Sequence, residues 1–391
     1  MATLGPVTET HRFDERRLAD YLRARDLSEF SGGLSVLQYQ GGQSNPTYRL
    51  EAGGRYFVLR KKPPGELLPS AHLVDREYRV MQALADTDVP VPTMIHLCED
   101  PAVIGQAFFV MEHVEGRVPA APGLPDVESA EERAAIYDAM NEALARLHSV
   151  DWAAVGLGDY GKPSDYLARQ VTLWTRQYEA ARHQPIPAME ALVEWLPAHI
   201  PAGDAFEEET TIAHGDYRLD NMILHPTEPR VVAIVDWELS TLGHPLADLA
   251  YNCMTYHLPE GPLWKGLGEV DCEALGIPSE EDYVAAYCRR TGREGVPDWD
   301  FFMAFGLFRL ASICQGVYAR ALQGNASSRN ALEVGAKSAH AGRGRLELRP
   351  PRLTAASGPG VCYAPLSSSF ARASRWTSSG PSARRSVREW A

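Results

Sequence analysis

Apolar positions recur at two spacings, and the change of spacing divides the chain into a strand-rich part and a mostly helical part. Alternation over 34–39, 47–51, 55–61 and 106–111 predicts strands, and glycine pairs mark turns between the first three. Helical spacing covers 14–26 and 72–85, and the second helix stops before Pro90 and Pro92. This order predicts an N-terminal α+β lobe over residues 1–112, built on a five-stranded sheet.

The chain from residue 113 to 337 follows a mainly helical pattern. After a Gly/Pro-rich linker at 116–125, helical spacing covers 128–148, 164–181, 188–199, 246–256, 280–291 and 299–322. Short strands are predicted at 210–213, 222–225 and 230–236. The aromatic side chains of the last helix are interpreted as core: Phe301, Phe302, Phe305 and Phe308. The predicted fold class is α+β with two lobes, an antiparallel sheet plus helix followed by a helical lobe.

Composition narrows the class of protein. The 391 residues are 45% hydrophobic and 23% charged, which is ordinary for a globular protein and excludes a coiled coil or a collagen-like repeat. The most apolar run, Phe301–Leu310, contains Gly306 and Arg309 and is shorter than the roughly 20 residues of a membrane span. No secretory signal follows Met1. We therefore expect a cytoplasmic protein without a membrane partner.

Charge and cysteine usage exclude two further classes. The net charge of −13 argues against a general nucleic-acid binder. Six cysteines without a C-x-x-C pair fit neither a disulfide scaffold nor a zinc site and are interpreted as reduced thiols. Nothing in these patterns indicates the oligomeric state.

Residues 338–391 differ from the rest of the chain. They contain nine Arg, no Lys and two Glu, which gives them a net charge of +7. Because the whole chain carries −13, residues 1–337 carry a net charge of −20. Their Arg, Ser and Pro content is typical of disorder. A frameshift near residue 339 is the competing interpretation, because one permitted codon choice for 340–351, shifted by one nucleotide, encodes the helix-like TLAEVAWSFAR. Sequencing the gene would decide between the two.

The densest polar cluster is H-G-D-Y-R-L-D-N over 214–221, followed by I-V-D-W-E with Asp236 at the end of a strand. Asp216 lies in a loop after a strand, and hairpin geometry can bring it to one end of a short sheet with Asn221 and Asp236. Phosphoryl transfer needs this set: one carboxylate to accept the proton of an attacking hydroxyl, and an amide oxygen and a second carboxylate to hold Mg²⁺.

These motifs, followed by G-H-P-L-A-D-L-A-Y at 243–251, resemble the aminoglycoside phosphotransferase and choline kinase group of small-molecule kinases. The stretches at 40–48, 56–65 and 236–248 more closely resemble the kinase-like domain fused ahead of some acyl-CoA dehydrogenases, and its stand-alone bacterial relatives. The resemblance covers roughly residues 30–337. It implies a two-lobed protein-kinase-like fold that binds ATP and Mg²⁺ in the cleft.

The resemblance also implies roles for single residues. Asp216 is expected to be the catalytic base, with Asn221 and Asp236 as the metal ligands. The residues expected to bind the nucleotide lie in the loop at 41–47, the strand at 55–61, the helix at 72–85 and a hinge between the lobes at 111–114. They are Gly41, Gly42, Ser44, Asn45, Arg60, Glu77, Glu112 and Val114. Asp248 is expected to be a buried acid that stabilises the catalytic loop without contacting the reacting groups. His214 is interpreted as structural, whereas Arg218 and Asp220 could contact substrate or solvent.

Two positions depart from the kinase pattern. Arg60 stands where kinases place a lysine, and a guanidinium can pair with Glu77 and phosphate but is not equivalent to an ammonium. If the register slips by one residue, Lys61 takes this role, but alternation then points it to the opposite face. The loop at 41–47 also lacks G-x-G-x-x-G, so Ser44 and Asn45 would supplement its backbone contacts.

The leading interpretation is an ATP- and Mg²⁺-dependent kinase acting on a small-molecule hydroxyl. The resemblance favours a hydroxyacyl-CoA acceptor over an aminoglycoside-type antibiotic. A catalytically silent nucleotide-binding module is the alternative that Arg60 suggests. A metallo-phosphoesterase fits less well, because such sites use more His and Asp ligands than this cluster offers.

Overall fold

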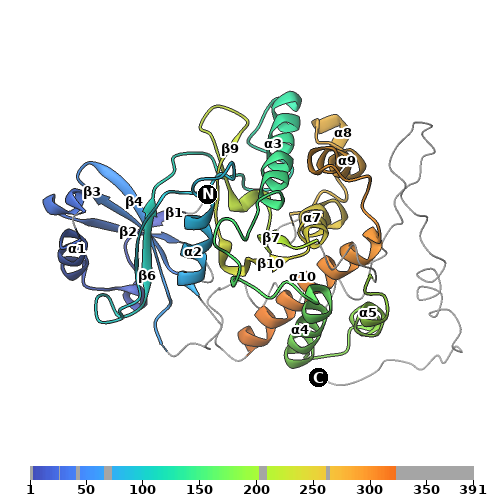
Figure 1. Cartoon of the computed structure of the whole chain (residues 1–391), viewed down its shortest axis with the longest axis horizontal. Coiled ribbons are helices and arrows are strands. Elements are labelled where there is room, and N and C mark those ends of the chain that lie inside the picture. The colour runs from blue at the N-terminus through green and yellow to red at the C-terminus, as the bar shows by residue number, and fades with distance from the viewer. Residues whose placement is uncertain are drawn as a thin grey trace, which may run out of the picture.

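An antiparallel sheet and a group of helices lie side by side in the computed structural model (Figure 1). The structure describes residues 3–25, 27–40, 45–65, 73–201, 209–260 and 265–322. Together they form a two-lobed kinase-like α+β fold, as the sequence predicts. Residues 41–44 of the predicted phosphate loop and the whole tail at 338–391 lie outside the described residues.

The first lobe is built on a sheet with the strand order β1-β2-β3-β4-β6-β5. Its six strands are β1 (Thr3–Gly5), β2 (Ser35–Gln40), β3 (Thr47–Ala52), β4 (Arg55–Lys61), β5 (Met94–Cys98) and β6 (Phe108–Glu112). The prediction of five strands was therefore one too few. The extra edge strand, β1, pairs with β2 from Thr3↔Gln40 to Gly5↔Gln38. Three residues are too short to show a recognisable alternation.

The two faces of the sheet are covered by different helices. Helix α1 (Glu15–Arg23), capped by the Asp14 side chain, belongs with Phe57 and Leu59 to one hydrophobic cluster. Helix α2 (Val74–Leu84) packs against β5 and β6 on the other face, in the cluster that includes Val58. Strand alternation along β4 thus assigns every side chain to one of the two faces.

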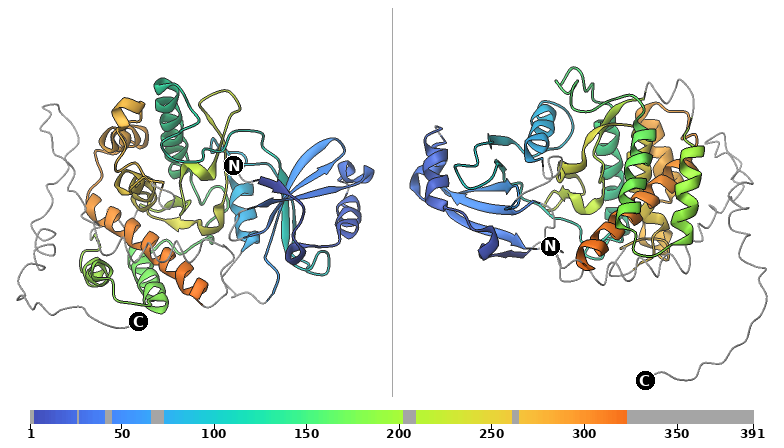
Figure 2. Two further views of the ribbon diagram at one scale, coloured as in Figure 1. Left: turned by 180° about the vertical axis from the view of Figure 1, so that it is seen from behind. Right: turned by 90° about the horizontal axis from the view of Figure 1, so that it is seen from below.

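The second lobe is mainly helical. Its helices are α3 (Ala130–His148), α4 (Tyr166–Ala181), α5 (Pro187–Ala198), α7 (Pro245–Cys253), α8 (Cys272–Leu275), α9 (Glu280–Thr291) and α10 (Trp299–Leu322). Two strand pairs lie between the lobes: β7 (Thr211–Ala213) with β10 (Thr241–Gly243), and β8 (Met222–Leu224) with β9 (Val231–Ile234). Figure 2 shows α10 running beside α4, which agrees with the extensive packing of α10 on α4 and α7.

Helix α10 is long and apolar enough to cross a membrane by length and composition alone, with a mean hydropathy of 1.4 over its best window. The prediction that no stretch approaches a membrane span was wrong by this measure. However, 67% of that window is buried within the protein. The four phenylalanines predicted as core are at most 3% exposed. The packing of α10 is that of the central helix of its lobe.

The cysteines within the described residues carry no disulfide. Cys98, Cys253, Cys272, Cys288 and Cys314 are free thiols, and four of these five are buried. This agrees with the predicted reduced state for these residues. Cys362 lies outside the described residues.

Candidate active site

Asp216 and Asn221 are in direct contact. The Asn221 side-chain Nδ2 donates to Asp216 Oδ2 and to the Asp216 backbone oxygen, both at 2.9 Å. Because a carboxylate only accepts, the amide nitrogen must face Asp216, which directs Oδ1 of Asn221 the other way. Asp216 follows β7, which pairs with β10 rather than with the β8–β9 hairpin. The prediction of a single shared sheet was therefore wrong, although the two polar groups do meet.

Asp236 reaches the same region from the end of β9. The backbone N–H of Val235 donates to the backbone oxygen of Asn221 at 2.9 Å, so the hairpin brings the residue after Val235 close to Asn221. Asp236 itself has φ of 69°, in the left-handed region that non-glycine residues seldom occupy. Such backbone outliers cluster at functional sites.

The carboxylate of Asp216 is held ionised. Burial opposes ionisation, but Arg218, His214 and Tyr251 together outweigh it and lower the pKa of Asp216. Arg218 Nε lies 2.9 Å from Asp216 Oδ1, and the Tyr251 hydroxyl donates to the same carboxylate. Sequence reasoning left Arg218 open and missed Tyr251. The missed signal was helical spacing, since Tyr251 lies three residues after Asp248 on α7.

His214 has both ring nitrogens engaged by the backbone. Nδ1 accepts from the N–H of Asp216 at 3.2 Å, so Nε2 carries the proton and donates to the oxygen of Val235 at 3.1 Å. The ring is fully buried and packs against Trp237. This arrangement fits the structural role and leaves neither nitrogen for proton transfer.

Asp248 holds the backbone just before Asp216. It is 2% exposed, and its oxygens accept from the N–H of His214 at 2.7 Å and of Gly215 at 2.9 Å. Burial opposes ionisation, but hydrogen bonding and attraction from His148 lower the pKa of Asp248. Gly215 has φ of 81°, and a Cβ there would lie 2.6 Å from the backbone oxygen of Leu239. Asp248 and this glycine together set the direction of the loop at 214–221.

Arg60 faces the site, and Lys61 does not. Arg60 Nη1 lies 3.1 Å from Glu77 Oε1, and its Nη2 lies 2.6 Å from Asp236 Oδ1. Arg60 shares the α2 face of β4 with Val58, whereas Lys61 lies on the opposite face, 5.3 Å from the ring of Phe13. The unshifted register is correct, and the expected Arg60–Glu77 pair is present.

The surroundings of Arg60 are rich in negative charge. Glu238, which sequence reasoning quoted in I-V-D-W-E but did not assign, lies 3.6 Å from Arg60 Nη2 and accepts from Asn45 Nδ2 at 3.3 Å. Three carboxylates therefore share one guanidinium. Burial raises the pKa of Glu77 to about 8, with support from Asp236 and Glu238, although Arg60 opposes the shift. A further cation would be stabilised here.

Two oxygens remain for such a cation. Neither Oδ1 of Asn221 nor Oδ2 of Asp236 hydrogen-bonds to any residue in the described ranges. Within those ranges, no group of three or more His, Cys, Asp or Glu side chains could hold a metal ion. An amide and a carboxylate oxygen beside excess negative charge fit Mg²⁺, which takes few protein ligands and keeps its waters.

The predicted hinge lies at the end of β6. Glu112 pairs with Phe57 of β4, and its N–H donates to the Thr93 oxygen at 2.9 Å. The N–H of Val114, two residues on, makes no hydrogen bond with any residue that the structure describes. Of the predicted phosphate loop only Asn45 and its successors are described, and Gly41, Gly42 and Ser44 lie outside the described residues.

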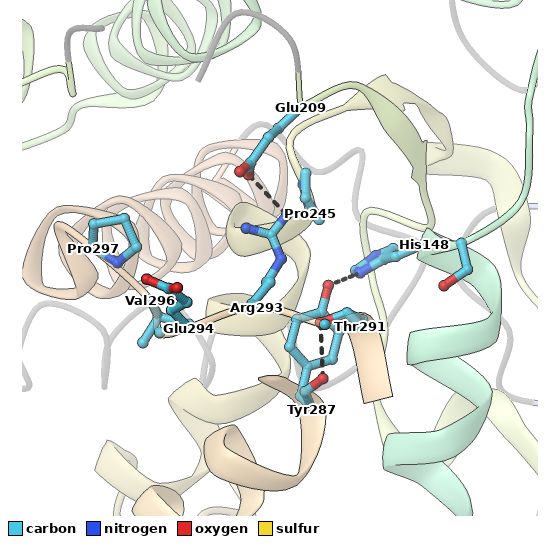
Figure 3. A pocket seen from close by; sticks show the side chains of 12 residues that line it. His148, Glu209, Pro245, Tyr287, Thr291, Arg293, Glu294, Val296 and Pro297 are labelled. Carbon is cyan, nitrogen blue, oxygen red and sulfur yellow. Dashed lines mark hydrogen bonds and ion pairs between the residues drawn. The ribbon is translucent and has the colours of Figure 1, made fainter. Parts of the chain in front are cut away.

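A cavity of about 1040 Å³ lies between the end of α3 and the segment that follows α9, and none of the predicted site residues lines it (Figure 3). Its wall includes the ion pair Arg293–Glu209 at 2.8 Å and the contact of His148 Nδ1 with the Tyr287 hydroxyl at 2.7 Å. His148 Nε2 in turn lies 3.4 Å from Asp248. The cavity is thus linked to Asp248 through His148 and does not coincide with the site.

Comparison with known proteins gives a consistent result. The model of the phosphotransferase enzyme family matches residues 35–304. Mouse (Mus musculus) acyl-CoA dehydrogenase family member 10 is 48% identical over 331 residues, which cover 84% of this chain and 30% of the relative. Human (Homo sapiens) acyl-CoA dehydrogenase family member 11 is 46% identical over 334 residues, covering 84% and 42%. This chain therefore spans less than half the length of these two relatives.

Solved structures show the same fold. The crystal structure of a candidate aminoglycoside phosphotransferase from Ralstonia eutropha JMP134 has 50% identity and a TM-score of 0.75, and covers 85% of this chain and 96% of that chain. Aminoglycoside phosphotransferase APH(4)-Ia, solved with ADP and hygromycin B, has 15% identity and a TM-score of 0.53, with coverages of 84% and 96%. At that identity the second match shows the fold alone.

Proposed function

This chain belongs to the phosphotransferase enzyme family, and on that premise we propose that it transfers the γ-phosphate of ATP to a small-molecule hydroxyl with the help of Mg²⁺. The nucleotide would lie between an N-lobe of residues 1–112 and a C-lobe of residues 113–337. The observation that carries the proposal is the convergence of Asp216, Asn221 and Asp236 with the Arg60–Glu77 pair.

The proposed chemistry follows from these side chains. The ionised Asp216 accepts a hydrogen bond from the acceptor hydroxyl and takes its proton as that oxygen forms a bond to the γ-phosphorus. The bond from this phosphorus to the β–γ bridging oxygen breaks, and ADP leaves. Asn221 and Asp236 would hold Mg²⁺, which neutralises charge on the phosphates. Arg60, fixed by Glu77, would orient the phosphates beside Asp236.

The acceptor is proposed to be a hydroxylated acyl-CoA, such as a 4-hydroxyacyl-CoA. Two relatives of 46–48% identity are named acyl-CoA dehydrogenase family members, and this chain matches only a part of each. A kinase joined to a dehydrogenase of acyl thioesters would act on the same acyl chain. An aminoglycoside is the other candidate acceptor, supported by the name of the bacterial relative with 50% identity.

A thermal melt with and without Mg²⁺-ATP tests nucleotide binding directly. A ligand present at 100 times its Kd adds about 2.7 kcal/mol to the free energy of unfolding, so a clear rise in Tm is expected. Phosphate transfer is then measured with a 4-hydroxyacyl-CoA and with an aminoglycoside. Binding without transfer to either would favour the silent nucleotide-binding module that Arg60 suggests. No rise in Tm would contradict the proposal.

A further inference from the structure

Arg309 is a buried cation in the helical lobe that the proposed chemistry does not use. It lies in the middle of α10 and is 7% exposed, and its Nε is buried without a hydrogen-bond partner. No carboxylate in the described ranges pairs with its guanidinium. Because a guanidinium keeps its charge at physiological pH, a buried one without a counter-charge is unfavourable unless something else compensates it.

Two aromatic rings hold this guanidinium in place. Its central carbon lies 5.2 Å from the ring centre of Trp174 on α4 and 4.9 Å from that of Tyr251 on α7. Such cation–π contacts stabilise the cation through its faces. The five N–H donors of a guanidinium, however, lie in its plane and point outward from the edge. The rings therefore fix the orientation of Arg309 and leave its donors for an oxygen ligand.

The same tyrosine connects Arg309 to the proposed catalytic base. The Tyr251 hydroxyl donates to the Asp216 carboxylate, and the ring of Tyr251 carries the Arg309 guanidinium. Helices α4, α7 and α10 all belong to the helical half of the molecule, away from the sheet that bears Arg60 (Figure 1). Arg309 is thus separated from Asp216 by one side chain and lies in the helical lobe, which is the part of the molecule expected to bind the acceptor.

A second cation strengthens the positive character of this region. Arg169, also on α4, has its Nη1 buried without a hydrogen-bond partner, while its Nη2 donates to the Lys162 oxygen. Both Arg169 and Arg309 act electrostatically on the Tyr166 hydroxyl, so the two guanidiniums belong to one part of the lobe. The buried guanidinium of Arg309 and the half-buried guanidinium of Arg169 together favour an anion in this part of the lobe.

We propose that Arg309 binds an anionic group of the acceptor, a carboxylate or a phosphate, through the edge of its guanidinium. This inference rests on the proposed function, because it assigns the acceptor side of the same site. It makes Arg309 a specificity-determining residue. It also accounts for a buried charge that the described residues leave uncompensated.

The test uses four acceptors with one acyl chain: a 4-hydroxyacyl thioester of 4′-phosphopantetheine, the same thioester of pantetheine, the free 4-hydroxy acid and the methyl ester of that acid. The first pair differs in phosphate and the second in carboxylate, so the two sources of the anion are distinguished. The variants are Arg309→Gln and Arg309→Lys, and the control on the same helix is Arg320→Gln, whose side chain is exposed.

We expect the native protein to prefer the anionic member of one pair by about 10-fold or more in KM, the range of a charge-assisted hydrogen bond. Arg309→Gln should abolish that preference, while kcat and the KM for ATP stay nearly constant. Arg309→Lys should retain part of it, which also covers the case in which the glutamine variant does not fold. A merely structural arginine would change stability and leave the preference intact, which would overturn the proposal.

The two proposals can fail separately. If no acceptor is phosphorylated but Mg²⁺-ATP still binds, calorimetry with the same four compounds measures acceptor binding without turnover. Tighter binding of an anionic compound to the native protein than to Arg309→Gln supports the inference even then. Equal binding to both proteins, or no binding of either anionic compound, overturns it. Failure of nucleotide binding contradicts the proposed function instead.

Discussion

Arg60 Nη2 lies 2.6 Å from Asp236 Oδ1, and this contact ties the central strand of the sheet to the turn that carries the proposed metal ligand. The same guanidinium lies 3.1 Å from Glu77, so three side chains from three separate elements form one connected group. The side chains of Arg60 and Glu77 are 11% and 2% exposed, so their interaction is little screened by solvent.

Replacing Arg60 by Met should therefore lower the free energy of unfolding by about 3–5 kcal/mol, the usual cost of breaking a buried pair. The double variant Arg60→Met/Glu77→Gln should lose less than the two single variants together, because each single variant already breaks the Arg60–Glu77 contact. Denaturant unfolding of all four proteins measures this coupling. Lys62→Met, at the neighbouring and more exposed position, serves as the control. Strict additivity of the two changes would contradict a direct interaction.

Asp216→Ala should reduce turnover by about 10²–10⁴-fold, the contribution of a positioned general base. Binding of Mg²⁺-ATP should be almost unchanged, since Asp216 is placed against the acceptor hydroxyl rather than the nucleotide. Asp220→Ala removes a carboxylate that is 41% exposed four residues away and should retain most of the activity. Loss of nucleotide affinity in Asp216→Ala would show that its role has been misassigned.

Asp236→Ala should weaken the binding of Mg²⁺-ATP, because it removes a proposed metal ligand and one of the three carboxylates around Arg60. Calorimetric titration at several Mg²⁺ concentrations measures the change. The exposed Asp86→Ala is a suitable control at the end of α2. An affinity equal to that of the native protein, with the same Mg²⁺ dependence, would rule out Asp236 as a ligand.

Asp248→Asn should lower Tm at neutral pH by leaving one of two buried N–H donors without an acceptor, at a cost of about 1–3 kcal/mol. The folded-state pKa of Asp248 is depressed below its usual 3.8. Its stabilisation is therefore complete above the unfolded-state pKa and is lost as pH falls through the folded-state pKa. The Tm difference between native and variant proteins should narrow below about pH 4. A gap independent of pH would indicate that the charge contributes little.

Much of this architecture was predictable from periodicity. The bounds of β4, α9 and α10 match the predicted ranges, since long apolar patterns and clear turn residues define them. Strand β1 was missed because three residues carry too little pattern, and β7–β10 pairing was missed because its partners lie far apart in the sequence. Such pairing depends on tertiary packing, which local propensity does not contain.

The residues of the motifs were easier to predict than their neighbours. Alternation along β4 correctly placed Arg60 rather than Lys61 on the side of Glu77. His148 and Arg309 gave no comparable signal, because each meets the site through another side chain. Contacts of this kind join positions separated by tens of residues, so a pattern read along a single sequence does not contain them.

Gly215 limits which substitutions a gene for this chain can accumulate while its product stays active. A side chain there would have to enter the space of the Leu239 backbone while keeping a left-handed conformation. Such a change would disturb the catalytic loop and leave the hydrophobic core intact, so a duplicated copy freed from selection for turnover could drift at this codon and still fold. The residue at position 215 would then distinguish working copies from decaying ones even where Asp216 and Asn221 persist.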